Sequence, residues 1–346
     1  MQKRGVIELQ FNWVFVLIVG ALILSLFIWF ALKQSEISST KLSKDVLTNL
    51  NTIFTGAKVS KGTVYEIKIS NINLEFNCNN NCFCTYKIQG YAGEGNQLKG
   101  ATVFAPNIIK SPDLIAWSLD WNVPYRVSNF LFLTSPKVRY ILGTGFDTTF
   151  SNTLTETLPR DLITVDTPPD WRDIDDTNNY KIKLLVAPDP NNPDYPKGER
   201  FNKDIKKTAE KDITAIKIDG IAEEGTITYY NYDINDGFSA INDYHYVGFP
   251  ALIAAIFADE DNYKCIMQDA YDRYNYVTKI YKERARQLQS STSTTCQTYY
   301  RDADDDLNEF PNTDPPFGLA STIFDYANNL EETNDNLLLY SCPLIY

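Results

Sequence analysis

The sequence is poor in the residues on which many hydrolases rely. Its 346 residues include a single histidine, His245, which stands between two tyrosines. No Gly-x-Ser-x-Gly motif is present. A serine or cysteine nucleophile needs a neighbouring base, most often histidine. These absences favour a structural role for His245 and give no catalytic residue. Asn-x-Ser/Thr is also absent, so we expect no conventional N-glycans.

Positive charge is also scarce. The chain has 32 Lys and Arg against 44 Asp and Glu. Without residues 1–33 these totals become 29 and 43, so the remainder carries 29 − 43 = −14. Nucleic-acid binding needs a basic face that displaces counterions from phosphates. We therefore expect no nucleic-acid partner.

One long stretch near the start has no charge at all. The 24 residues from Leu9 to Leu32 contain no Asp, Glu, Lys, Arg or His. As a helix rising ~1.5 Å per residue the stretch is about 36 Å long, against a hydrocarbon core of ~30 Å. It is also long for a cleaved signal peptide. The sequence predicts a transmembrane helix over residues 9–33, with the membrane as its partner, and a single-pass protein of the cell membrane.

All six cysteines follow that stretch. An even number is typical of disulfides in an oxidising compartment, and their spacing does not fit most zinc sites. We therefore expect three disulfides and a large extracellular domain. We expect Cys265 to pair with Cys296, Cys342 to be bridged, and the remaining three cysteines to staple a hairpin tip. The six are Cys78, Cys82, Cys84, Cys265, Cys296 and Cys342.

The amino-terminal residues MQKRGVIELQFNWVFVLIVG place a short basic stretch before a glutamate and an apolar helix. This arrangement resembles the leader of archaeal type IV pilin-like proteins and of other archaeal surface proteins, over about 30 residues. The resemblance implies cleavage between Arg4–Gly5 and the rest of the chain, and later packing of the apolar helix in a filament core. Glu8 is the third residue after Gly5, whereas bacterial-type pilins place this glutamate fifth.

A plain signal anchor is the alternative explanation of the same segment. Glu8 then stabilises the positive end of the helix dipole. Trp13 and Trp29 then lie near the two membrane interfaces, where tryptophan is common. Both explanations use the same apolar helix.

The remaining chain favours the α/β class, with a β-rich segment, a mainly parallel sheet and carboxy-terminal helices. Strands alternate with helices through its middle, and two apolar stripes at three-to-four spacing predict long helices over 263–288 and 319–330. We also expect a helix after Pro124 through Leu131, a helix over 202–211, an edge strand over 225–232 and a loop over 290–295. The predicted segments are a cytoplasmic tail or leader (1–8), the transmembrane helix (9–33), an amphipathic helical stalk (34–56), a β-rich segment (57–112), an α/β segment (113–247) and a helical segment (248–346).

Two stretches resemble ligand sites. Gly143-Thr-Gly145 follows a predicted strand, but it lacks the third glycine and the lysine of nucleotide-binding loops, which favours a simple turn. Asp302, Asp304 and Asp306 are spaced like the first ligands of a calcium-binding EF-hand loop. Leu307 replaces the glycine of that loop, so a solvated acidic helix end is the alternative. We expect no cofactor, with calcium as the one metal considered.

The leading hypothesis is a non-enzymatic surface protein that acts in a filament or envelope assembly with other subunits. The first alternative is an anchored extracellular hydrolase, which convergent carboxylates in a deep pocket would favour. The second is an anchored receptor or binding module.

Overall fold

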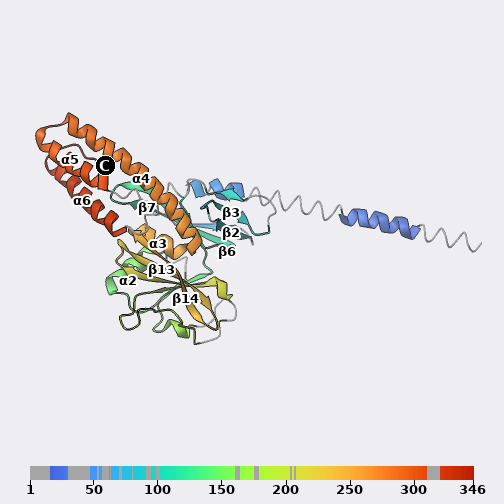
Figure 1. Cartoon of the computed structure of the whole chain (residues 1–346). Helices are drawn as coiled ribbons and strands as arrows, with labels where there is room; N and C mark the ends of the chain where they lie inside the picture. Colours follow the sequence, from blue (N-terminus) through green and yellow to red (C-terminus); the bar gives the residue numbers. More distant parts are fainter. Residues whose placement is uncertain are drawn as a thin grey trace, which may run out of the picture. The chain divides into compact units, whose positions relative to one another are not determined.

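A computed structural model describes most of the chain (Figure 1). The chain divides into two compact units. The first contains residues 16–29 and 47–51 with Gly90, and the second contains the other described residues. The described residues are 16–29, 47–52, 54–56, 62, 64–69, 72–79, 81–90, 95–98, 102–159, 164–174, 179–202, 205, 208–309 and 320–346.

The main element of the first unit is a helix over residues 16–29, drawn in blue in Figure 1. Among the described residues, no helix is both long enough and apolar enough to cross a membrane. The predicted transmembrane helix over 9–33, and the single-pass cell-membrane location deduced from it, are therefore wrong on this finding.

The second unit contains a four-stranded sheet in the order β1-β7-β8-β5. The long strands β7 (Asp113–Asn122) and β8 (Arg126–Thr134) pair antiparallel at its centre, between β1 (Val64–Lys68) and β5 (Val103–Phe104). The helix predicted after Pro124 is therefore wrong. Phe130 to Leu133 are all buried, which is typical of a strand covered on both faces.

A six-stranded sheet has the order β10-β9-β11-β12-β13-β14. It is mixed, because β10 to β12 run parallel while β13 and β14 pair antiparallel, so the mainly parallel sheet is only partly confirmed. The predicted edge strand is the interior strand β13, since β14 lies beyond it. The periodicity of β14 is weak because its residues from Ser239 to Asp243 are all exposed. The strands are β9 (Val138–Leu142), β10 (Thr164–Asp166), β11 (Lys181–Val186), β12 (Ile213–Gly220), β13 (Glu224–Asp233) and β14 (Gly237–Val247).

The segments that connect the strands of this sheet match the predicted helices only in part. Helix α2 (Thr148–Thr157) lies between β9 and β10, and its N-terminus is capped by Asp147. The helix predicted over 202–211 is wrong for the described residues there, since only the short 3-10 turn η2 (Glu210–Asp212) forms. A second 3-10 turn, η1 (Trp171–Asp173), precedes β11.

The β-rich segment is confirmed by a second four-stranded sheet, in the order β4-β3-β2-β6. Strands β2 (Asn73–Cys78) and β3 (Cys84–Ile88) form a hairpin, flanked by β4 (Asn96–Gln97) and β6 (Ile108–Lys110). Ahead of it, residues 47–52 and 54–56 are helical, and the Phe54 ring packs on that of Tyr86 at 5.4 Å. Most of the predicted stalk over 34–56 lies outside the described residues.

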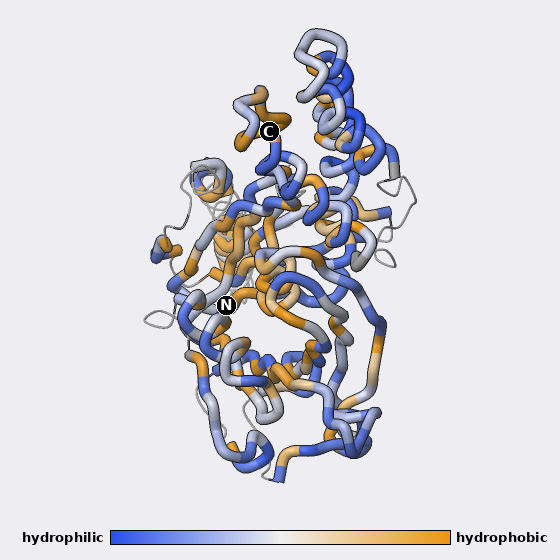
Figure 2. Tube along the Cα trace, turned by 90° about the vertical axis from the view of Figure 1, so that its left-hand side faces the viewer, coloured by the Kyte–Doolittle hydropathy of each residue, from blue (hydrophilic) through white to orange (hydrophobic). Residues whose placement is uncertain are grey.

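Helix α3 (Phe249–Phe257) lies between the first sheet and the six-stranded sheet. Residues 251 to 257 are all buried, as expected for a helix that is apolar on every side. The Phe257 ring contacts Trp117 of β7 and Tyr140 of β9. Figure 2 shows apolar segments, in orange, in the interior. Helix α3 therefore joins two sheets into one core.

The last third is helical, as predicted. Helices α4 (Glu260–Ser291), α5 (Thr294–Glu309) and α6 (Ala320–Leu339) pack in sequence (Figure 1). The predicted loop over 290–295 is shorter than expected, because α4 continues to Ser291 and α5 begins at Thr294. The polar residues of α5 lie on its exposed side, while Ala303 and Leu307 are buried.

All six cysteines form disulfides, which confirms the expected chemistry, but one predicted pair is wrong. The bridges are Cys78–Cys84, Cys82–Cys265 and Cys296–Cys342. Cys265 lies near the start of α4 and Cys296 follows its end. The 26 residues between Cys265 and Ser291 span about 39 Å of helix, so Cys265 and Cys296 cannot meet.

Candidate functional site

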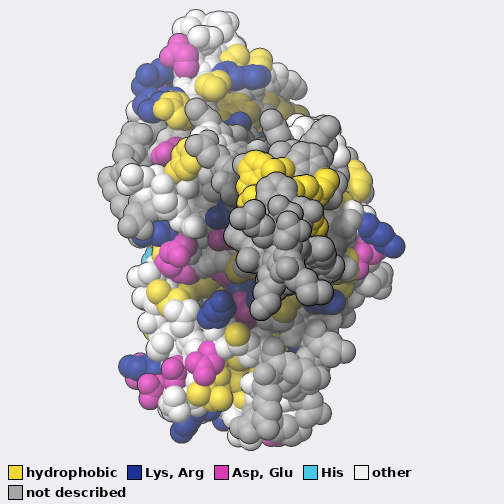
Figure 3. All heavy atoms as spheres, turned by 90° about the vertical axis from the view of Figure 1, so that its right-hand side faces the viewer, with side chains coloured by type: hydrophobic (Ala, Val, Ile, Leu, Met, Phe, Trp, Pro, Cys, Tyr) yellow, Lys and Arg dark blue, Asp and Glu magenta, His cyan; other side chains and the backbone are white. Residues whose placement is uncertain are grey.

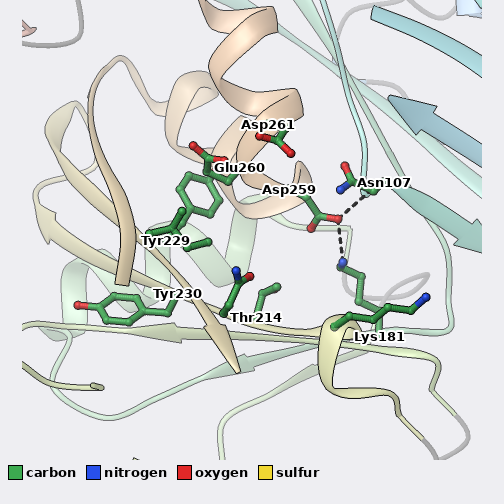
Figure 4. A pocket seen from close by; sticks show the side chains of 11 residues that line it. Asn107, Lys181, Thr214, Tyr229, Tyr230, Asp259, Glu260 and Asp261 are labelled. Atoms are coloured by element: carbon green, nitrogen blue, oxygen red, sulfur yellow. Dashed lines mark hydrogen bonds and ion pairs between the residues drawn. The ribbon is translucent and has the colours of Figure 1, made fainter. Parts of the chain in front are cut away.

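A polar cleft lies between the first turn of α4 and the face formed by β11 to β14 (Figure 4). Its volume is about 330 Å³. The side chains of Asn107, Lys181, Thr214, Asn231, Asp259 and Glu260 are among those lining it. Carboxylates, ammonium groups, amides and a hydroxyl therefore share one hollow in the second unit.

Two lining residues, Lys181 and Asp259, belong to a buried group of three charges, the lysine–aspartate triad, whose third member is Lys183. The two lysines alternate on β11 and so point from the same face of the strand. Only 3% of Lys181 and 1% of Lys183 is exposed. Asp259 lies at the junction of α3 and α4, with a carboxylate oxygen 2.8 Å from Lys181 Nζ and the other 3.1 Å from Lys183 Nζ.

Burial and charge act against each other in the triad. Burial alone would raise the pKa of Asp259, but the ammonium groups of Lys181 and Lys183 outweigh it and hold that pKa well below its usual range. Burial lowers the pKa of Lys183 to about 8, although Asp259 opposes this shift. A buried ion pair is stable only when its remaining hydrogen-bonding groups are also satisfied. The neighbours of the triad meet most of that requirement, whereas one carboxylate oxygen of Asp259 has the ion pair with Lys183 but no hydrogen bond.

These neighbours are mostly backbone groups. The Asn107 backbone N–H donates to Asp259 at 2.9 Å. Lys183 donates to the carbonyls of Phe257 and Ala258, at the carboxyl end of α3, where a cation is favourable. The Asn262 amide donates to the Ala105 carbonyl at 3.2 Å. The triad therefore fastens the α3–α4 junction to β11 and to the segment before β6.

The first turn of α4 adds two adjacent carboxylates, Glu260 and Asp261, beside Asp259. Glu260 accepts hydrogen bonds from the Asn242 amide, at 2.9 Å, and from the Tyr244 hydroxyl. Partial burial, followed by the neighbouring Glu260, raises the pKa of Asp261. Three successive acidic residues, 259 to 261, thus line the cleft, but the carboxylate of Asp259 is already engaged by two cations and an amide.

The cleft lies at an unusual edge of its sheet for an enzyme. Lys181 is the first residue of β11 and Thr214 the second of β12, so the cleft is at the amino ends of these parallel strands. Ligands of open α/β sheets usually bind at the carboxyl ends. There, Gly145 has a φ of +106°, and a Cβ on Gly143 would lie 3.0 Å from the Leu185 carbonyl oxygen. Backbone geometry therefore explains both glycines, and Asp147 already caps the helix that follows.

The remaining candidates do not add catalytic groups. His245 Nδ1 lies 3.1 Å from the Thr226 hydroxyl on the neighbouring strand, a cross-strand pair of the ordinary kind. No cysteine is free. In the described part of the chain, then, neither a thiol nor a histidine–carboxylate pair is placed for nucleophilic catalysis.

The acidic run on α5 does not converge on a point. Asp304 is 2.9 Å from Arg286 of α4, and Asp302 lies 3.7 Å from Arg301. Asp302, Asp304 and Asp306 stand on a regular helix rather than on a loop. Throughout the described ranges, no three His, Cys, Asp or Glu side chains are grouped so that they could hold a metal ion.

The helix over 16–29 exposes many large apolar side chains. Ten of its side chains are each more than half exposed, and these lie on every side of the helix. Its one hydroxyl, that of Ser25, donates to the Leu22 carbonyl at 2.9 Å. The ten are Val16, Leu17, Ile18, Leu22, Ile23, Leu24, Leu26, Phe27, Ile28 and Trp29.

The residues of the pilin-like leader, Arg4, Gly5 and Glu8, lie outside the described residues, so that resemblance stays a prediction. On the face shown in Figure 3, coloured basic and acidic side chains are interspersed. The absence of a nucleic-acid partner stays a prediction from the net charge. Comparisons of the chain with protein-family models, curated proteins and solved structures gave no match.

Sequence reasoning missed the triad. Its signal was two lysines at alternate positions in a strand that is otherwise apolar, Lys-Ile-Lys-Leu-Leu-Val. Their partner Asp259 is 78 residues beyond Lys181, and only the fold joins them.

Proposed function

We propose that this chain is a non-enzymatic subunit of an assembly, in which copies of the helix over 16–29 pack together. The single observation that supports this is that the helix is apolar and exposed on all sides. Fully burying a large apolar side chain stabilises by about 1.5–3 kcal/mol, so ten of them give on the order of 15 kcal/mol. Exposed apolar surface on that scale marks an interaction site.

The distribution of these side chains supports several partners rather than one. A helix with one apolar face needs only one surface to cover it, whereas a helix apolar all round must be surrounded. Copies of the same helix provide such surroundings. The internal hydrogen bond of Ser25 removes the one polar side chain that would oppose burial.

Two further features agree with the proposal. The pilin-like leader implies removal of residues 1–5, which brings the apolar helix close to a new amino terminus at Val6. Three disulfides in the second unit are typical of proteins that work in an oxidising compartment. Neither feature requires an active site.

A matched pair of substitutions tests the proposal. Ile23 is 51% exposed on the helix and Ile221 is 52% exposed on the turn between β12 and β13. We expect Ile23→Asp to abolish sedimentable assemblies of the full chain, because it puts a charge into the shared apolar core. Ile221→Asp should leave them intact. Assemblies that survive Ile23→Asp would contradict the proposal, and so would purified assemblies whose chains still begin at Met1.

The polar cleft favours a second candidate, a binding module for a small polar ligand. Its mixed lining of amides, a hydroxyl and opposite charges suits a zwitterion or a sugar more than a hydrolytic reaction. A panel of free amino acids and monosaccharides tests this. Binding should raise the melting temperature of the wild-type chain but not that of Asn231→Leu, and no rise with any compound would dismiss the candidate.

A further inference from the structure

We propose that the outer side of α4 forms a two-fold symmetric contact with α4 of a second copy of this chain. The surface concerned, called here the α4 stripe, consists of Tyr276, Lys279, Ile280, Glu283 and Gln287. These residues recur at spacings of three and four, and so lie along one side of the helix. They line a shallow hollow in the surface of the second unit.

The stripe is exposed although its centre is apolar. Tyr276 is 69% exposed and Ile280 is 66% exposed, whereas Tyr271 and Tyr274 on the opposite side of α4 are buried in the core. The polar members already contact one another in the single chain. Lys279 Nζ lies 5.7 Å from the centre of the Tyr276 ring, and the Gln287 amide donates to Glu283 at 3.1 Å. The stripe therefore carries Lys279 and Glu283 in fixed positions, while Arg284, which also lines the hollow, donates to the Leu344 carbonyl at 3.0 Å.

The order of Lys279 and Glu283 along α4 is complementary to that of a second α4 running antiparallel to it. In an antiparallel pair centred on Ile280, the two Ile280 side chains meet. Tyr276 lies four residues to one side of that centre, and the partner's Glu283 lies three residues to the same side. Their levels along the axis differ by about 1.5 Å, and those of Lys279 and the partner's Glu283 by about 3 Å. The carboxylate is then within reach of a hydroxyl and an ammonium group, twice over by symmetry.

Parallel pairing of the same stripe is worse. It would set Lys279 level with the partner's Lys279 and Glu283 level with the partner's Glu283, which places like charges together. Charge complementarity therefore selects the antiparallel, two-fold arrangement. A two-fold contact is isologous and closes on itself, so it joins two copies and does not extend.

This contact goes beyond the proposed packing of the helix over 16–29. Copies bundled by parallel helices all point the same way, whereas the α4 contact reverses direction. It would therefore link free subunits in pairs, or join two neighbouring bundles that run in opposite directions.

Disulfide trapping in the full chain tests the register. Ile280→Cys should form covalent dimers under mild oxidation, because the two Cα atoms come within the ~7 Å limit of a disulfide. Tyr276→Cys alone should not, because its two copies lie about 12 Å apart along the axis. A mixture of Tyr276→Cys and Glu283→Cys chains should again form dimers. Lys279→Glu should slow trapping at position 280, and adding Glu283→Lys should restore it.

The same trapping in a chain that carries Ile23→Asp separates the two proposals. Dimers through position 280 that persist there would support the α4 contact whatever the helix over 16–29 does. Absence of these dimers in both backgrounds would overturn the α4 contact. Equal trapping by Tyr276→Cys alone would overturn it as well, since that outcome indicates association without register.

Discussion

At the scale of single residues, the lysine–aspartate triad joins strand β11 to the α3–α4 junction within the second unit. Two ammonium groups share one carboxylate, and all three are buried. Breaking such a group is costly when the removed partner leaves a buried charge uncompensated, and cheaper when it removes the surplus charge. The three residues should therefore differ strongly in their effect on stability.

Substitutions at Asp259 and Lys183 test this asymmetry. Asp259→Ala leaves two buried cations without an anion, and we expect the free energy of unfolding to fall by about 3–5 kcal/mol. Lys183→Met keeps the Lys181–Asp259 pair and removes the surplus cation, so we expect a loss of less than about 2 kcal/mol. Urea unfolding measures both values. Equal losses for the two variants would contradict the account.

The pH dependence of stability follows from the lowered pKa of Lys183. Its pKa is about 8 in the folded chain, against 10.5 in the absence of the fold. Between these values the unfolded chain binds more protons than the folded one, so the free energy of unfolding rises with pH. We expect a rise from pH 8 to about 9.5 in the wild type, absent in Lys183→Met. Buried tyrosines with raised pKa, such as Tyr246, oppose it at higher pH, where the unfolded chain ionises first.

At the scale of elements, the residue pattern within a segment predicted the helices that form within that segment. Helices α4 and α6 were predicted because their apolar residues recur at a spacing of three to four. Strand β8 was missed because Pro124 suggests a helix start, whereas Pro124 lies in the short turn that joins β7 to β8 in an antiparallel hairpin. Strand β14 was missed because exposed polar residues fill its middle. The partner of Cys265 could not be predicted, since Cys82 is 183 residues away.

The disulfides differ in the length of chain that they close. Cys82–Cys265 has a sequence separation of 183 residues and Cys78–Cys84 one of 6. On the chain-entropy account these loops correspond to about 5 and about 2 kcal/mol of stabilisation. We expect Cys82→Ser with Cys265→Ser to lower the melting temperature clearly more than Cys78→Ser with Cys84→Ser. Calorimetry of the two double variants measures this, and the reverse order would contradict the account.

At the scale of the whole molecule, the segment that contains the helix over 16–29 stands out in the sequence by its lack of charge and in the structure by its exposed apolar side chains. The sequence gives a run without charge, from which we predicted a membrane span. Among the residues that the structure describes, no helix is both long enough and apolar enough to make that span. What remains is an exposed, largely apolar helix in a chain with a disulfide-bonded second unit, and we propose that copies of the helix cover one another.

Electron cryomicroscopy of assemblies formed by the full chain shows whether the helices over 16–29 pack together. We expect helices over 16–29 from several copies to lie together inside the assembly, with neighbouring axes about 8–10 Å apart. We expect the disulfide-bonded second units to lie outside. Assemblies in which these helices face solvent, without contact to one another, would contradict this packing.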